Sequence, residues 1–212
     1  MSYQQSKDQQ QPQQQQKYLI PVKCVLIGPT FSGKTSLVVR LVRETFSKES
    51  QPTVGAMFLN KTFQFSTHFI KLEVWDTAGQ EKFNSLAPMY FKKSKVAIIV
   101  FDLSDRQSFV KAKMWNNEFK THATEPAIMI LIGNKCDLNK TVLQSDIDDF
   151  IREEKENSID FTYFEASAKE NTNVNNIFET IAGKIPWKEE IRERTEALQV
   201  SPVINKKKKC CK

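Results

Sequence analysis

The fold of this chain is indicated most clearly by the segment Gly28-Pro29-Thr30-Phe31-Ser32-Gly33-Lys34-Thr35. It fits the pattern G-x-x-x-x-G-K-[ST], in which backbone N–H groups and the start of a helix surround phosphate oxygens. The apolar run Val22–Ile27 before it is typical of a buried strand, and Lys34–Phe46 after it has helical spacing. These neighbours favour a phosphate-binding loop over a glycine-bounded turn with a solvated lysine. In such a loop Lys34 contacts the β- and γ-phosphates, and the Thr35 hydroxyl binds Mg²⁺.

Strands and helices alternate along the rest of the chain. Phe58–Phe65 and Phe69–Trp75 alternate in polarity around a short polar turn, which predicts a hairpin. Further strands are expected at Val96–Leu103, Ile128–Ile132 and Phe161–Phe164, and further helices at Asp105–His122, Ser145–Glu156 (with Ser145 as the N-cap) and Val174–Ile185. The prediction is an α/β protein with a mostly parallel sheet of about six strands, one antiparallel hairpin and helices on both faces.

The composition predicts one folded domain with an extension at each end. The chain has 212 residues, of which 40% are hydrophobic, and this is enough for one core over residues 18–187. Residues 1–17 contain nine glutamines and almost nothing apolar, so we expect disorder there, and residues 188–212 are expected to form a flexible tail. Neither a bilayer-spanning run of roughly 18 to 20 apolar residues nor a signal peptide is expected.

The positive charge of the chain is concentrated at its end. The net charge is +6, and Lys206–Lys209 with Lys212 supply five of the positive charges, so the folded part is nearly neutral. This distribution argues against binding to nucleic acid. Disulfide and zinc-ligand spacings are missing among the four cysteines, Cys24, Cys136, Cys210 and Cys211. Their pattern fits a reducing, cytosolic environment; Cys24 is expected in the core, and His68 and His122 at the surface.

A second motif, Asp76-Thr77-Ala78-Gly79-Gln80-Glu81, ends the predicted hairpin. An acidic residue at a strand end beside a phosphate loop can hold the metal ion, directly or through water. Gly79 allows the backbone to approach a γ-phosphate, and Gln80 can orient an attacking water. A lone Asp-x-x-Gly is common in turns, so the motif gains its meaning from its place after the phosphate loop and the hairpin.

A third motif, Asn134-Lys135-Cys136-Asp137, indicates which base is bound. It follows the apolar run Ile128–Ile132 and should lie at the carboxyl end of a strand, where open α/β sheets bind ligands. The Asp137 carboxylate can accept hydrogen bonds from N1–H and the exocyclic amine of guanine, whereas adenine offers neither at these positions. A site built on such a pair rejects the wrong base by roughly 10⁴-fold or more.

With these motifs the chain resembles the small GTPases of the Ras superfamily, and within it the Rab family. The likeness extends over roughly residues 20–187 and the C-terminus. It implies that Thr53 contacts Mg²⁺ and the γ-phosphate in the GTP state and that Phe46 packs on the guanine. The implied nucleotide-binding residues are Gly28, Thr30, Phe31, Ser32, Gly33, Lys34, Thr35, Ser36, Phe46, Thr53, Asp76, Gly79, Asn134, Lys135, Asp137, Ser167, Ala168 and Lys169. The implied metal ligands are Thr35, Thr53 and Asp76, and the implied catalytic residues are Gln80, Lys34 and Thr53.

Several segments are more similar to Rabs than to Ras proteins. These are Trp75–Glu81, the paired cysteines near the C-terminus, and the stretches Ser85–Tyr90 and Ser108–Trp115, which resemble the early-endosome branch of Rabs. Phe58, Trp75 and Tyr90 match the apolar triad through which Rabs present their nucleotide state to effectors, although each of the three can also be a plain core residue.

The C-terminus resembles a membrane anchor. Cys210 and Cys211 match the double geranylgeranylation site of Rabs, and two lipid chains, or one chain with a basic patch, anchor a protein stably. The four lysines before them would add roughly 1 kcal/mol each near an anionic cytoplasmic leaflet. A run of solvated lysines without such a role is the alternative.

The resemblance implies a switch that hydrolyses Mg·GTP to GDP and phosphate and regulates vesicle trafficking. It also implies four kinds of partner: an exchange factor, an activating protein, a GDP-dissociation inhibitor or escort protein, and effectors. A monomer is expected on the cytoplasmic face of early endosomes or other endocytic vesicles, with a cytosolic pool when extracted. An arginine finger cannot be assigned within the chain, so turnover should be slow without an activating protein. The alternatives are a pseudo-GTPase scaffold with impaired hydrolysis and a P-loop kinase, which leaves Asn134–Asp137 and the tail unexplained.

The phosphate loop departs from the family pattern at its centre. Small GTPases carry small residues there, whereas this chain has Thr30 and the bulkier Phe31. Phe31 either points to solvent or a partner, or it perturbs hydrolysis. Our hypothesis from the sequence is weaker intrinsic GTPase activity with intact nucleotide binding.

Overall fold

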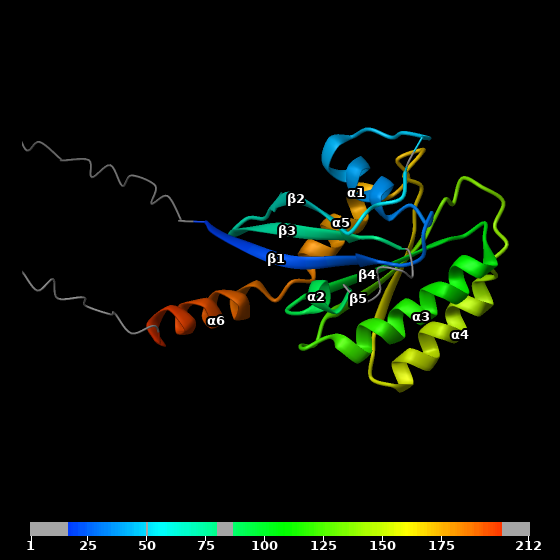
Figure 1. Ribbon diagram of the computed structural model, residues 1–212. Helices are drawn as coiled ribbons and strands as arrows, with labels where there is room; N and C mark the ends of the chain where they lie inside the picture. The colour runs from blue at the N-terminus through cyan, green and yellow to red at the C-terminus, as the bar shows by residue number, and fades with distance from the viewer. Residues whose placement is uncertain (1–16, 50, 80–86, 201–212) are drawn as a thin grey trace, which may run out of the picture.

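The structure, a computed structural model, describes residues 17–49, 51–79 and 87–200. In this part of the chain six strands form one sheet in the order β2-β3-β1-β4-β5-β6. Neighbouring strands are parallel except β2 and β3, which form the antiparallel hairpin. Figure 1 shows helices on both faces of this sheet. The α/β class, the hairpin and the mostly parallel sheet are thus confirmed.

The bounds of the elements agree with the sequence pattern except at several ends. The strands are β1 (Tyr18–Ile27), β2 (Ala56–Gln64), β3 (His68–Thr77), β4 (Val96–Asp102), β5 (Ile128–Asn134) and β6 (Phe161–Glu165). The helices are α1 (Lys34–Arg43), α2 (Ala87–Phe91), α3 (Arg106–His122), α4 (Gln144–Glu156), α5 (Val174–Gly183) and α6 (Trp187–Val200). Helix α1 stops before Phe46 because Glu44 takes a left-handed conformation (φ 59°) and donates its N–H to the Arg40 carbonyl.

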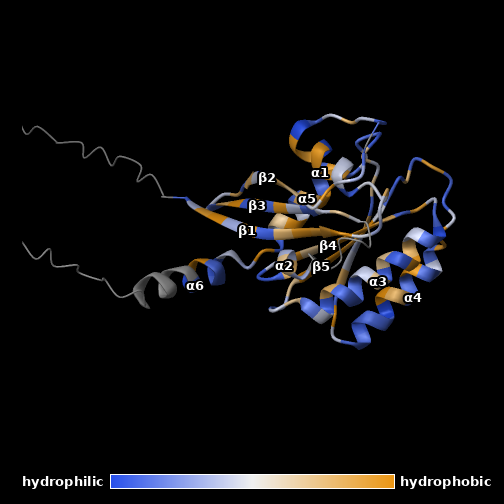
Figure 2. Cartoon of the chain, viewed as in Figure 1, coloured by the Kyte–Doolittle hydropathy of each residue, from blue (hydrophilic) through white to orange (hydrophobic). Residues whose placement is uncertain are grey.

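Each face of the sheet has its own hydrophobic core. On one face α1 and α5 cover the strands, with Leu37 and Phe178 fully buried. On the other face α3 contributes Phe109, which packs on Phe101 of β4, and α4 contributes Phe150, which packs on Phe109. Figure 2 shows hydrophobic strands in the middle of the sheet and largely hydrophilic outer surfaces on α3 and α4. This two-sided burial explains why the central strands are continuous apolar runs.

The parallel strands place the predicted motifs at one edge of the sheet. β1 ends at Ile27 just before the phosphate loop, and β3, β4 and β5 end at Thr77, Asp102 and Asn134. These four ends lie together because β3, β1, β4 and β5 are neighbours and run in the same direction. Ligands of open α/β sheets bind at this edge.

One prediction about a helix end is wrong. Ser145 is not the N-cap of α4: the helix begins at Gln144 and its N-cap is Leu143, whose carbonyl accepts from Asp146 and Ile147 N–H. The first turn therefore closes earlier than the capping pattern suggested.

Helix α6 (Trp187–Val200) lies at the start of the segment for which a flexible tail was predicted. Trp187 and Ile191, four residues apart, pack against the first core, and Lys95 forms ion pairs with Glu190 and Glu193 of α6 at 3.4 Å. In the described part of the chain, no helix is both long and apolar enough to cross a bilayer.

The expectation that His68 lies at the surface is also wrong, because its side chain is only 7% exposed. The imidazole is stacked between Phe65 and Trp187, with ring centroids 4.9 and 4.5 Å away. Trp187 comes from the distant start of α6, so the sequence around His68 does not reveal this contact. Burial lowers the pKa of His68. His122 is exposed and Cys24 is buried, as expected.

This burial predicts that acid destabilises the fold through His68. Because the pKa of His68 is lower in the folded protein, its stabilising contribution is present above the unfolded pKa of about 6.5 and is lost as pH falls below it. We expect the free energy of unfolding in urea to decrease between about pH 7.5 and about pH 5.5 by more in the wild type than in His68→Phe. The phenylalanine keeps a stacking ring but cannot be protonated. Equal decreases in the two proteins would contradict this assignment.

Candidate functional site

Both glycines of the phosphate loop, Gly28–Thr35, are required by close contacts. Gly28 and Gly33 have φ angles of 137° and 90°, which side chains rarely tolerate. A Cβ at Gly28 would lie 2.2 Å from the Val100 carbonyl oxygen, and one at Gly33 would lie 2.1 Å from Asn134 Nδ2. The loop is therefore pressed against the ends of β4 and β5, and its shape depends on the missing side chains.

Lys34 lies folded beneath this loop. Its Nζ donates to the carbonyls of Gly28 and Pro29, both at 2.8 Å, and the residue is 5% exposed. Burial lowers the pKa of Lys34 to about 8, although the Asp76 carboxylate opposes the decrease. A Cβ at Gly79 would lie 2.5 Å from the Pro29 carbonyl carbon and 2.6 Å from Nζ, so only glycine allows this approach. An anion bound over the loop would favour the charged form of Lys34.

Three oxygen-bearing side chains converge beside the loop. Thr35 Oγ1 donates to Asp76 Oδ2 at 2.5 Å and lies 2.8 Å from Thr53 Oγ1. Asp76 is fully buried, and its Oδ1 has no hydrogen-bond partner among the described residues. Burial raises the pKa of Asp76 to about 6, against the opposing effects of Thr35, Lys34 and Thr53. A buried carboxylate oxygen and two hydroxyls are ligands that suit Mg²⁺.

Next to the phosphate loop is a cavity of about 230 Å³ with the residues of the base motif in its wall. Phe46 lines this cavity, and its side chain also packs against the first core. Asn134, Lys135 and Asp137 line it from the end of β5. A smaller hollow of about 50 Å³ lies between the loop and Thr53. The two hollows share Gly33 and Ser36, as expected for one elongated ligand.

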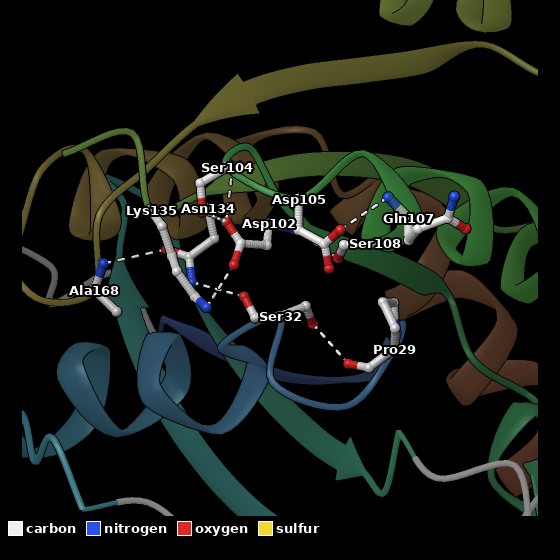
Figure 3. A network of polar contacts seen from close by, with 10 residues as sticks. All are labelled: Pro29, Ser32, Asp102, Ser104, Asp105, Gln107, Ser108, Asn134, Lys135 and Ala168. Carbon is white, nitrogen blue, oxygen red and sulfur yellow. Dashed lines mark hydrogen bonds and ion pairs between the residues drawn. The ribbon is translucent and has the colours of Figure 1, made fainter. Parts of the chain in front are cut away.

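Asn134 joins three loops through its buried amide. Nδ2 donates to the Ser32 carbonyl at 2.8 Å, and Oδ1 accepts from the Ala168 N–H at 3.3 Å (Figure 3). The residue is 1% exposed. Asn134 is therefore placed to hold the loops together rather than to reach far into the cavity.

The last loop is fixed from two sides. Ser167 donates to Asp137 Oδ1 at 2.6 Å, and this hydrogen bond holds the pKa of Asp137 below its usual value. Asp137 is thus a carboxylate with acceptor oxygens at the cavity wall, and Lys169 Nζ lies 3.7 Å from it. From α1, Arg40 donates to the carbonyls of Ala168 and Lys169 at 2.9 and 3.0 Å. Contacts within the protein thus fix this loop from both Asp137 and Arg40.

Phe31 points to solvent, and it does so at the junction of the two hollows. Its side chain lines both of them and is 66% exposed. Its φ angle is 63°, a left-handed conformation that costs a bulky residue about 1–2 kcal/mol. A strained, exposed aromatic side chain at this point is a candidate for a role toward the ligand.

The predicted apolar triad is brought together on β2, β3 and α2. Phe58 and Trp75 face each other in the hairpin with ring centroids 5.3 Å apart, and the Trp75 and Tyr90 centroids are 5.7 Å apart. Phe58 is 45% exposed. The three side chains form one continuous and partly accessible aromatic surface.

Some predicted residues cannot be placed, and others were missed. Gln80, Cys210 and Cys211 lie outside the described residues. Arg40 was missed because its partners come from the far end of the chain. Asp102 was also missed, although an acid that ends an apolar strand at the ligand-binding edge is a signal the sequence does contain.

Comparison with known proteins agrees with this geometry. The model of the Ras family matches residues 23–186. The Ras-related protein Rab-22A of Mus musculus is 39% identical over 167 residues, which cover 78% of this chain and 84% of that protein. The Ras-related protein Rab-31 of Homo sapiens is 41% identical, with 78% and 83% covered, and the GTP-binding protein ypt5 of Schizosaccharomyces pombe is 38% identical, with 83% of each chain covered. The chain therefore belongs to the Ras family and is a Rab-type small GTPase.

Proposed function

We propose that this GTPase holds the GTP phosphates over Gly28–Thr35 and the guanine in the cavity beside Phe46. The observation that carries the proposal is the convergence of Thr35, Thr53 and Asp76 next to the buried Lys34. At the other end of the site, Asp137 offers the acceptor oxygens that guanine N1–H and the exocyclic amine need. Triphosphate and base ends thus have separate, complementary partners.

Mg²⁺ fits the phosphate end of this site. Asp76 Oδ1 is buried without a partner in the described chain, and the Thr35 and Thr53 hydroxyls lie beside it, so these three residues would hold the ion, directly or through water. Bound there, Mg²⁺ neutralises charge on the β- and γ-phosphate oxygens. Among the described residues no three His, Cys, Asp or Glu side chains cluster as a metal site. A site with one carboxylate suits an ion that also takes phosphate oxygens as ligands.

The proposed reaction is attack of water on the γ-phosphate, which leaves GDP and inorganic phosphate. Lys34 would place its ammonium under the phosphates. Because Gly79 approaches the loop closely, its backbone would lie near the γ-phosphate. Gln80 would orient the water. We expect slow turnover until an activating protein supplies an arginine.

Switching and membrane attachment complete the proposal. GTP would order the segments around Thr53 and Gly79, and the change would reach effectors through the aromatic surface of Phe58, Trp75 and Tyr90. We propose an endocytic membrane as the location, with the paired C-terminal cysteines as lipid-attachment sites. An exchange factor, an activating protein and a GDP-dissociation inhibitor or escort protein would control the cycle, with the GTPase itself acting as a monomer.

Asp137→Asn tests the assignment of the base. Asparagine replaces one acceptor oxygen by a donor, which suits the C2 carbonyl of xanthine better than the amine of guanine. We expect the affinity for GTP to fall by roughly a hundredfold or more while the affinity for XTP rises. Equilibrium titration with labelled nucleotides measures both, and Asp149→Asn on the outer surface of α4 serves as the control. Unchanged GTP affinity in Asp137→Asn would show that guanine is not read here.

Phe31→Ala tests the hypothesis of weakened hydrolysis. The substitution removes the ring from the junction of the two hollows, so the γ-phosphate and the attacking water gain space. We expect single-turnover hydrolysis of bound GTP to be several times faster than in the wild type, with nucleotide affinity retained. Equal rates would contradict the hypothesis. If neither protein releases phosphate, the chain binds nucleotide as a scaffold instead.

Cys210→Ser combined with Cys211→Ser tests membrane attachment. Without thiols for lipid attachment, only the lysines remain to hold the chain on an anionic surface, and that is insufficient for stable anchoring. We expect the double variant to move from the membrane pellet to the soluble fraction of a cell lysate. The two single variants show whether one or both cysteines are modified. A double variant that still sediments with membranes would rule the cysteines out as the anchor.

A further inference from the structure

An ion pair with one buried partner lies beside the base cavity and has no part in the proposal so far. Lys135 Nζ is 2.6 Å from Asp102 Oδ2, and the Asp102 side chain is 9% exposed. The two residues come from neighbouring strands, since Asp102 ends β4 and is paired in register with Asn134 of β5. Figure 3 shows the Lys135 side chain running alongside Asn134 toward this carboxylate.

The Asp102 carboxylate is itself held rigidly. Its Oδ1 accepts from the Ser104 N–H at 2.8 Å and from the Ser104 hydroxyl at 2.7 Å, which leaves Oδ2 for Lys135. Its backbone N–H donates to Ser108 Oγ at 2.9 Å, which ties the end of β4 to α3. Because Ser104 occupies Oδ1, the Lys135 ammonium has one defined position on this carboxylate, at Oδ2.

This anchor matters because Lys135 is a wall of the base cavity. The residue has a φ angle of 61°, a left-handed conformation that is unfavourable for a lysine. A lysine side chain has several free torsions, whereas one tied at its end presents its apolar stem in one place. A planar base can pack on such a stem only while the stem stays there.

We propose that Asp102 is a positioning residue for the guanine nucleotide. By holding Lys135 Nζ, it keeps the lysine stem against the base and so slows nucleotide release. The inference rests on the proposed guanine site and adds a residue that does not touch the ligand. Asp102 acts through Lys135, and Ser104 acts one step further out by fixing the Asp102 carboxylate.

The test uses release of a fluorescent GDP from the full-length protein, chased with excess unlabelled GDP in the presence of Mg²⁺. Asp102→Asn keeps an oxygen that can accept from Ser104, but it has no negative charge and cannot form an ion pair with Lys135. We therefore expect GDP to be released roughly tenfold faster than from the wild type. Ser104→Ala keeps the charge of Asp102 but removes the hydroxyl that holds its Oδ1. We expect GDP to be released about two- to threefold faster than from the wild type. Glu154→Gln is the matched control, because Glu154 is 5% exposed and paired with Lys120 at 2.9 Å but lies away from the site.

A double-mutant cycle separates positioning from a structural effect. In a Lys135→Met background there is no ammonium to hold, so Asp102→Asn should not speed release further. The inference is overturned if Asp102→Asn releases GDP at the wild-type rate, if it has the same effect in both backgrounds, or if Glu154→Gln speeds release equally. A wild-type protein that binds no labelled GDP would instead refute the guanine site itself.

Discussion

The amide of Asn134 is buried between three loops from distant parts of the chain, and both of its polar atoms are used. It donates to the Ser32 carbonyl and accepts from the Ala168 N–H. A buried amide without these partners would lose free energy, so the loops that carry the phosphate and base sites are held at a fixed spacing. Gly33 approaches Asn134 so closely that no Cβ fits between them. The spacing of these loops thus depends on the Asn134 side chain and on the absence of a side chain at Gly33.

The two buried charged residues at the phosphate end, Lys34 and Asp76, are suited to a bound anion and a bound cation. Burial lowers the pKa of Lys34 and raises that of Asp76, so each side chain is held where its charged form is disfavoured. Their mutual attraction only partly offsets this. Phosphate oxygens over Lys34 and a divalent cation beside Asp76 would each restore the charged form, which links occupancy of the site to its stability. Under the proposed function, the residues that bind the ligand would also be stabilised by it.

Much of the site could be predicted because its motifs are local and follow strands. The phosphate loop, Asp76 and Asn134–Asp137 each come directly after an apolar run, and parallel strands bring such ends to one edge. The failures have a common origin. His68 was predicted at the surface because its partner Trp187 is distant in sequence. Helix α6 was not predicted because its sequence is mostly charged, and its apolar residues Trp187 and Ile191 are stabilised only by packing on the first core.

The amino-acid order by itself determined the α/β class, the hairpin, the phosphate loop and the motif predicted to read guanine, because each is a pattern within a few residues of chain. The tertiary structure was needed for Arg40, Asp102 and the surroundings of Phe31. Arg40 holds a loop from the other end of the chain, and Asp102 meets Lys135 only because β4 and β5 are neighbours in the sheet. Hydrogen bonds and ion pairs reach only a few ångströms, so contacts between segments far apart in sequence exist only once the sheet has set their positions.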